Sequence, residues 1–155
     1  MFSKIKIALL VALLFGIPLA VSAAEEADFV DIFEKFNEAR KTADIKTLTT
    51  VLVDAQVKGI EECIDNSICG EHFVKNLKND ALISYRVTDF VEFDSSGNIV
   101  KHRNRKNTIE YVSGPAAQIY YVGEEVRGDK GQGIMTFVME EGEWKISMTL
   151  WKKKE

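Results

Sequence analysis

Alternating apolar and polar residues over 132–151 predict a β-hairpin that turns at Glu141-Gly142. Because side chains alternate along a strand, counting outward from the turn places the large apolar residues of both arms on one face. The predicted pairs are Met139 with Trp144, Phe137 with Ile146, Met135 with Met148, and Gly133 with Leu150. A slip of one residue would put the two apolar sets on opposite faces, so the pattern specifies the register. In this register Trp151 lies on the face opposite Trp144 and is a candidate for an exposed aromatic contact.

Helical periodicity dominates the first half of the chain. Apolar residues at three- and four-residue spacing over 27–41 predict an amphipathic helix. Asp44 is a good N-cap for a second helix, which is expected to end near Gly59. After a short irregular or helical link over 60–69, a third helix is predicted over about residues 69–79.

Strand patterns fill the second half. Residues 81–93 alternate, and further strands are predicted over 99–112 and 117–126, with turns between them. The positions expected to share one face of the first strand are Ile83, Tyr85, Val87, Val91 and Phe93. Helices that are grouped before strands predict a single α+β domain over residues 24–155, with three N-terminal helices packed on a curved antiparallel sheet of about five strands.

Two stretches resemble the NTF2-like superfamily. The phrase Phe33-Glu-Lys-Phe-Asn-Glu-Ala39, followed by Asp44 and the second helix, is similar to its opening helices. The stretch from Met135 to Ile146, with Gly142-Glu-Trp-Lys-Ile146, is similar to its final hairpin. The resemblance implies a cone-shaped fold, often with a pocket inside and often dimeric. This superfamily includes isomerases, small-molecule hydrolases and non-catalytic binding modules, so the fold alone does not choose the function.

The first 23 residues have the pattern of a secretory signal peptide. Lys4 and Lys6 precede an apolar run over residues 7–20, and small residues follow over 21–24. We therefore expect cleavage before Ala24 or Glu25, no stable membrane anchor after cleavage, and a periplasmic or secreted protein. The alternative is an uncleaved anchor, because the apolar run is near the length that spans a bilayer.

Charge and cysteine content narrow the functional classes. Cleavage would leave 18 basic and 24 acidic residues, a net charge of −6, which argues against general nucleic-acid binding. In an exported protein, Cys63 and Cys69 predict a disulfide that staples a turn between two helices. Five intervening residues differ from the redox motif, and His72 alone does not complete a zinc site. We therefore expect neither a metal nor a cofactor.

Asp89 is the leading candidate for a site residue. It shares a predicted face with Tyr85, where an apolar residue would be expected. A symmetric turn over 94–98 places Asp89 opposite Arg103, with Arg105 nearby. Together with Tyr85 or Tyr111, these groups would form a ligand-binding pocket suited to a polar or anionic small molecule.

Plainer interpretations compete with this pocket. Asp89 and Arg103 can be a solvated cross-strand ion pair, or a β-bulge can turn Asp89 outward and put Phe90 inside. The basic run over 101–106 is interpreted as a solvated strand, and the lysines over 152–154 as a solubilising tail rather than a membrane patch. The tripeptide over 127–129, Arg-Gly-Asp, is interpreted as a chance product of a polar turn.

No catalytic constellation emerges from these patterns. We therefore expect an exported, non-catalytic binding domain of the cell envelope whose partner is a small molecule or a protein, with a homodimer as a further expectation. One alternative is a small-molecule isomerase or hydrolase that uses Asp89 with tyrosines inside the cone. Another is a periplasmic immunity or inhibitor protein. A cone filled by Phe, Met and Trp side chains would argue against the enzyme.

Overall fold

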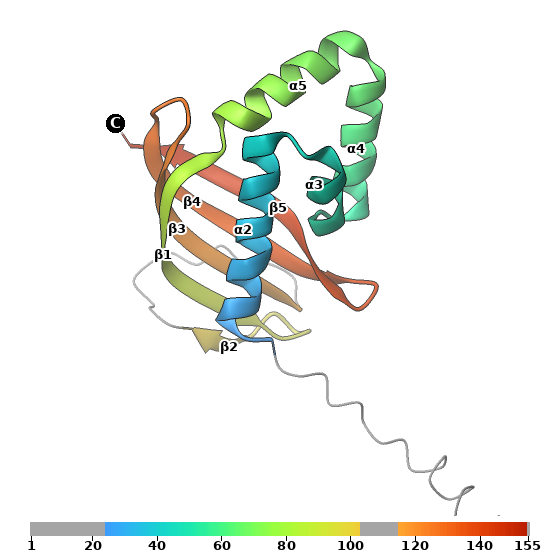
Figure 1. Ribbon diagram of the computed structural model, residues 1–155. Helices are drawn as coiled ribbons and strands as arrows, with labels where there is room; N and C mark the ends of the chain where they lie inside the picture. The colour runs from blue at the N-terminus through green and yellow to red at the C-terminus, as the bar shows by residue number, and fades with distance from the viewer. Residues whose placement is uncertain (1–23, 103–114, 155) are drawn as a thin grey trace, which may run out of the picture.

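The computed structural model describes residues 24–102 and 115–154, so the predicted signal peptide lies outside the described residues. The helices there are α2 (Glu26–Thr42), α3 (Ile45–Val51), α4 (Asp54–Asp65) and α5 (Ser67–Asn79). The strands are β1 (Leu82–Phe93), β2 (Ile99–His102), β3 (Ala116–Glu125), β4 (Lys130–Glu140) and β5 (Glu143–Lys153). They form one antiparallel sheet in the order β2-β1-β3-β4-β5, with the helices on one side (Figure 1). The predicted α+β class is confirmed.

The helical part has four helices where the sequence predicted three. The second helix, α3, ends at Val51 instead of continuing to Gly59. The next residue, Leu52, forms a parallel bridge with Ile146 of β5, and the Val53 N–H donates to the Ile146 carbonyl at 3.1 Å. These bonds to the sheet interrupt the hydrogen bonds of the helix. A new helix, α4, begins at Asp54 and contains Gly59 in its interior. The link predicted over 60–69 is mostly helical.

An aromatic core fills the space between α2 and the sheet. Phe29 of α2 contacts the rings of Phe90, Phe137 and Trp144, with ring centroids 5.3, 5.2 and 5.0 Å away. One turn later, Phe33 contacts Tyr85 at 4.6 Å. Such pairs each add about 0.5–1.5 kcal/mol to the stabilisation from burial. The space between α2 and the sheet is therefore a packed core.

A β-bulge between Val87 and Asp89 divides β1 into two registers. Before the bulge, Tyr85 and Val87 pack towards the helices, and after it Phe90 does so. Val91 and Phe93 belong to a second cluster on the opposite face, which we call the outer face. The predicted common face of β1 is therefore wrong, because the extra residue inverts the alternation. The alternative prediction, a bulge that puts Phe90 inside, is confirmed.

A second bulge lies in the closing hairpin. The predicted pairs Met139–Trp144 and Phe137–Ile146 are confirmed. Beyond them the register shifts between Thr136 and Phe137, so Gly133 pairs with Trp151 instead of Leu150. Met135 likewise pairs with Thr149 instead of Met148.

Ser147 is the extra residue of this second bulge. Its carbonyl accepts a hydrogen bond from Gln56 Nε2 of α4 at 2.6 Å, and its hydroxyl donates to the Thr136 carbonyl at 3.3 Å. The shift turns Trp151 to the helix side, where it stacks on Tyr121 with centroids 6.0 Å apart. The prediction that the two tryptophans lie on opposite faces is therefore wrong.

Candidate functional site

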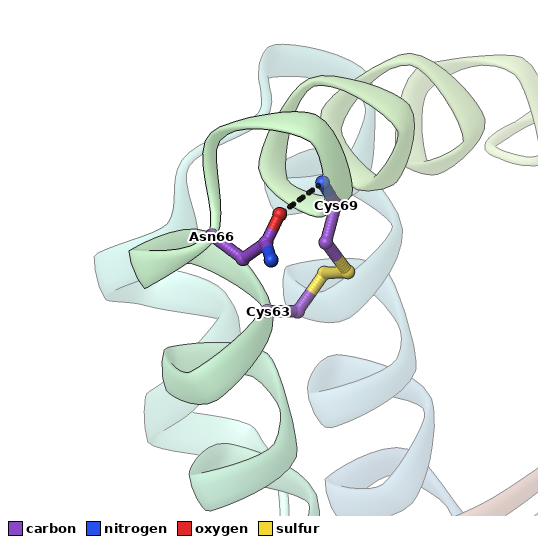
Figure 2. Close-up of a disulfide and its surroundings, with 3 residues drawn as sticks. All are labelled: Cys63, Asn66 and Cys69. Carbon is purple, nitrogen blue, oxygen red and sulfur yellow. Dashed lines mark hydrogen bonds between the residues drawn. A yellow bond between two sulfur atoms is a disulfide. The ribbon is translucent and has the colours of Figure 1, made fainter.

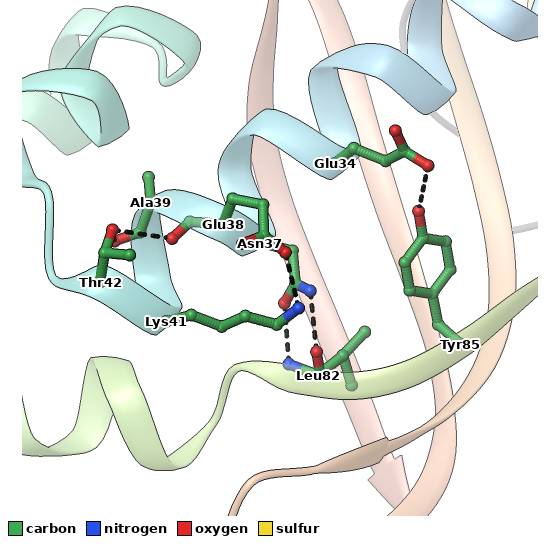
Figure 3. A network of polar contacts seen from close by, with 8 residues as sticks. All are labelled: Glu34, Asn37, Glu38, Ala39, Lys41, Thr42, Leu82 and Tyr85. Atoms are coloured by element: carbon green, nitrogen blue, oxygen red, sulfur yellow. Dashed lines mark hydrogen bonds and ion pairs between the residues drawn. The ribbon is translucent and has the colours of Figure 1, made fainter.

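The residues predicted to form a pocket do not share one face of the sheet. Tyr85 lies on the helix side, where its hydroxyl donates to Glu34 Oε1 at 2.7 Å (Figure 3). Burial, together with the bond to Glu34, raises the pKa of Tyr85 above its usual range.

Asp89 lies beyond the bulge on the outer face, 2% exposed, and its Oδ1 accepts the Phe90 N–H at 2.8 Å. Arg103, Arg105 and Tyr111 lie outside the described residues.

Buried polar side chains near Asp89 bond to one another. The hydroxyl of Tyr120, whose backbone lies opposite Asp89, donates to Gln118 Oε1 at 2.9 Å. Gln118 Nε2 in turn donates to Thr136 Oγ1 at 3.3 Å. Each of these side chains is at most 5% exposed. A buried polar group that lacks a hydrogen-bond partner destabilises the fold. The primary role of this network is therefore to stabilise the outer face of the sheet.

The Arg-Gly-Asp turn is held inside a network of ion pairs. Arg127 Nε lies 2.8 Å from Glu125 Oε2 and 3.0 Å from Asp129 Oδ2, and its Nη1 lies 3.0 Å from Asp80 Oδ1. Burial raises the pKa of Glu125, and the neighbouring Arg127 opposes that rise. The tripeptide therefore joins the β3–β4 turn to the start of β1, which agrees with its interpretation as a structural turn.

An open groove of about 850 Å³ lies at the end of the sheet where β5 reaches Lys153. Two rows of cross-strand neighbours project into it from the outer face. The first row is Arg86, Val122, Gln132 and Lys152. The second row is Ser84, Glu124, Lys130 and Lys154, with the Lys154 N–H donating to the Lys130 carbonyl at 2.7 Å. We call this hollow the basic groove.

Positive charge in the basic groove is poorly neutralised. Among the described residues, Arg86, Lys152 and Lys154 have no carboxylate within 4.0 Å, and Lys130 lies 3.4 Å from Glu124. Lys153, on the neighbouring position of β5, pairs with Asp129 at 2.6 Å. Four cationic side chains thus share one carboxylate in a chain whose net charge is −4. Such a local excess of one sign attracts oppositely charged ligands.

Glycines on the helix side allow the strands beneath the groove to pack closely. A Cβ at Gly123 would lie 2.7 Å from the Ser84 carbonyl oxygen, and one at Gly131 would lie 2.9 Å from Trp151 Cζ2. A Cβ at Gly131 would also overlap the Lys152 carbonyl oxygen. Real Cβ atoms do not approach other heavy atoms so closely, so the two positions require glycine. The backbone that carries both rows of the groove is therefore held by tight packing on its other side.

A second, apolar crevice of about 300 Å³ lies under α4. Its walls include Phe36 of α2, Leu48 of α3, Leu77 of α5 and Ile146 of β5. Gly59 of α4 also lines it, and a Cβ at that position would meet nothing within 4 Å. The crevice carries no charged side chain, so it offers no group for acid–base chemistry.

Sequence reasoning missed the residues of the basic groove. The lysines over 152–154 were interpreted as a tail, but β5 runs through Lys153 and Lys154 bonds to β4. The triplet was a usable signal, because extending the predicted hairpin brings these lysines beside the start of β4. Arg86 gave no such signal, since only the order of strands in the sheet brings it to the same row.

The described part of the chain, residues 24–102 and 115–154, contains no group of three or more His, Cys, Asp or Glu side chains arranged to hold a metal ion. None of its helices is long and apolar enough to span a bilayer.

Comparison with known proteins adds one likeness of fold. No protein-family model and no curated protein sequence matches the chain. Among solved structures, it is similar to an NTF2-like protein of unknown function from Shewanella baltica, with 14% identity and a TM-score of 0.43. The match covers 85% of this chain and 98% of that protein. At this identity and TM-score, the match assigns no function to the chain.

Proposed function

We propose that this chain is an exported, non-catalytic binding domain that takes a small anionic ligand in the basic groove. The observation that carries the proposal is the pair of cross-strand rows, which place Arg86 at one end of the groove and Lys152 and Lys154 at the other, without acidic partners among the described residues. Lys130 adds a fourth cation at the centre of the second row. Groups of this kind recognise carboxylate, phosphate or sulfate oxygens.

The interior of the fold supports binding over catalysis. An isomerase or hydrolase of NTF2-like type would need acid and tyrosine groups together in an apolar pocket. Here Tyr85 and Asp89 lie on opposite faces of the sheet, and the space along α2 is filled by Phe29, Phe33 and Trp144. The enzyme alternative therefore loses the combination of Asp89 with Tyr85 on which it was based.

Export is supported by the disulfide between Cys63 and Cys69. It joins the end of α4 to the start of α5, where Asn66 Oδ1 accepts the Cys69 N–H at 3.1 Å (Figure 2). Disulfides persist in oxidising compartments such as the periplasm or the extracellular space. This agrees with the signal-peptide pattern of the first 23 residues, which stays a prediction.

Isothermal titration calorimetry with pyrophosphate and with citrate tests the anion site. The groove is open and its cations are exposed, so we expect binding that weakens steeply as salt is added. The double variant Lys152→Gln/Lys154→Gln should weaken binding about tenfold or more. The matched control is Lys46→Gln/Lys75→Gln, which removes the same net charge at exposed positions on α3 and α5. Equal weakening in both variants, or none in the groove variant, would reject the proposal.

A protein partner is the second candidate, and one surface favours it. At the tip of the α4–α5 arm, Ile68 is 72% exposed and Ile64 is 38% exposed, beside the disulfide. Native mass spectrometry of the mature protein, purified gently from its own cell envelope, separates the two candidates. A bound species of a few hundred daltons supports the groove, whereas a second protein in the complex supports the arm.

A further inference from the structure

An apolar strip continues from the basic groove along the outer face of β4 and β5. Its members are Ile134 and Val138 of β4 and Met148 and Leu150 of β5. Leu150 is 39% exposed and pairs directly with Ile134, and the other three are half-buried. Exposed apolar surface next to a charged site is a common sign of a binding surface.

The apolar strip and the basic groove share one face and one register. The pair Gln132–Lys152 belongs to the groove, and Ile134–Leu150 is the next pair on the same face. Side chains two residues apart on a strand lie about 6.6 Å apart, so the strip begins where the cations end. From Ile134 to Val138 it extends about 13 Å further along β4. One ligand can therefore contact both surfaces.

We propose that the ligand of the basic groove is a single-chain anionic amphiphile. Its headgroup lies at the β4–β5 end of the groove, at Lys130, Lys152 and Lys154, and its hydrocarbon chain lies on the apolar strip. This inference rests on the proposed function and makes it more specific, because a simple anion would leave the strip unused. It selects molecules with one charged end, such as fatty acids or monoalkyl phosphates, over fully polar anions.

The charges at the far end of the strip favour this ligand over a second copy of the chain. A second copy would need free carboxylates to meet the basic groove. The acids beyond Val138 are Glu140, Glu141 and Glu143. Only Glu141, at the hairpin turn, is without a partner among the described residues, and one carboxylate does not match the cations of the groove. Glu140 Oε2 accepts the Asp54 N–H at 3.0 Å, and Glu143 pairs with Lys145 at 2.8 Å. The headgroup of an amphiphile supplies the missing negative charge instead.

Calorimetric titration with inorganic phosphate, butyl phosphate and decyl phosphate, each below its critical micelle concentration, tests this inference. We expect decyl phosphate to bind at least 30-fold more tightly than butyl phosphate, because each methylene that becomes buried gains up to about fourfold. The variant Leu150→Thr should remove most of that difference and leave the affinity for inorganic phosphate unchanged. Threonine suits an exposed strand position, and Ile68→Thr on the α4–α5 arm is the matched control.

The outcomes separate the inference from the proposed function beneath it. Equal affinities for butyl and decyl phosphate overturn the amphiphile and leave the anion site standing. Failure of every phosphate, pyrophosphate and citrate to bind overturns both. A dimer that Leu150→Thr converts to a monomer in sedimentation, without any effect on decyl phosphate, assigns the strip to contact between copies and overturns the inference. Loss of decyl phosphate binding in Ile68→Thr as well as Leu150→Thr also overturns it, because the effect is then not local.

Discussion

Asn37 of α2 and Leu82 of β1 are joined by two reciprocal hydrogen bonds. Asn37 Nδ2 donates to the Leu82 carbonyl at 2.9 Å, and the Leu82 N–H donates to Asn37 Oδ1 at 2.7 Å (Figure 3). Asn37 is 3% exposed and Leu82 is also 3% exposed, so water does not replace these bonds. They fix the helix on the first strand of the sheet, close to the point where the Arg127 network joins Asp80.

Replacing this asparagine should cost much more stability than its size suggests. Asn37→Leu has a similar volume but leaves the buried N–H and carbonyl of Leu82 without partners. Each such group costs about 1–3 kcal/mol, so we expect a loss of about 2–4 kcal/mol in the free energy of unfolding by urea. Asn76→Leu, at an exposed position of α5, is the control and should change it by under about 0.5 kcal/mol. Similar small effects for both variants would show that the two bonds contribute little.

Two glycines should respond in opposite directions to the same added methyl group. At Gly133, a Cβ would overlap the Tyr121 ring, which is held between Phe33 and Trp151 and has no room to move. Gly133→Ala should therefore destabilise the protein by about 1–3 kcal/mol. At Gly59, in the interior of α4, the methyl group meets nothing, so Gly59→Ala should stabilise it by about 0.5–1 kcal/mol. Urea denaturation of both variants checks the pair, and a shared sign would contradict it.

The sequence predicted the class and the order of the elements because helical and strand periodicities are local. It failed where contacts distant in sequence changed a local pattern. The hydrogen bond from Gln56 to Ser147 accompanies the bulge in β5, and the bonds of Leu52 and Val53 to Ile146 end α3 early. A bulge inverts every later position of its strand, so one extra residue misplaced Trp151.

The candidate site was harder to predict than the fold. Asp89 stood out because a carboxylate broke an apolar alternation, and the bulge beside it explains that break. The basic groove combines Arg86, Lys130 and Lys152 from three strands. Those residues meet only when the strand order and the register are both known. Only the lysines over 152–154 could have been noticed from the sequence.

The disulfide should stabilise the α4–α5 arm more than the rest of the molecule. Cys63 and Cys69 close a short loop, with Cα atoms 5.2 Å apart, and α4 contributes no fully buried side chain. The double variant Cys63→Ala/Cys69→Ala should lose about 2 kcal/mol. In hydrogen exchange, amides of α4 and the start of α5 should lose protection while those of β3 keep theirs. Equal loss of protection in the helical arm and in the sheet would show that the arm unfolds only with the whole domain.

Tyr121 should make the protein less stable at alkaline pH. Burial raises the pKa of Tyr121 to about 12, although the nearby Arg40 acts in the opposite direction. In the unfolded chain a tyrosine ionises near pH 10. Between about pH 10 and 12 the unfolded state therefore releases a proton that the folded state keeps, and stability falls as the pH rises. The full effect of this one group is about 2–3 kcal/mol.

The variant Tyr121→Phe isolates this contribution, because every other ionisable group is present in both proteins. Urea midpoints measured at pH 8, 10 and 11 should fall more steeply for the natural protein than for the variant. Absorbance at 295 nm should show that the natural protein keeps one more protonated tyrosine until it unfolds. Parallel slopes in the two proteins would mean that Tyr121 ionises in the folded state at its ordinary pKa. That result would contradict its burial between Phe33 and Trp151 and, with it, the close packing beneath the basic groove.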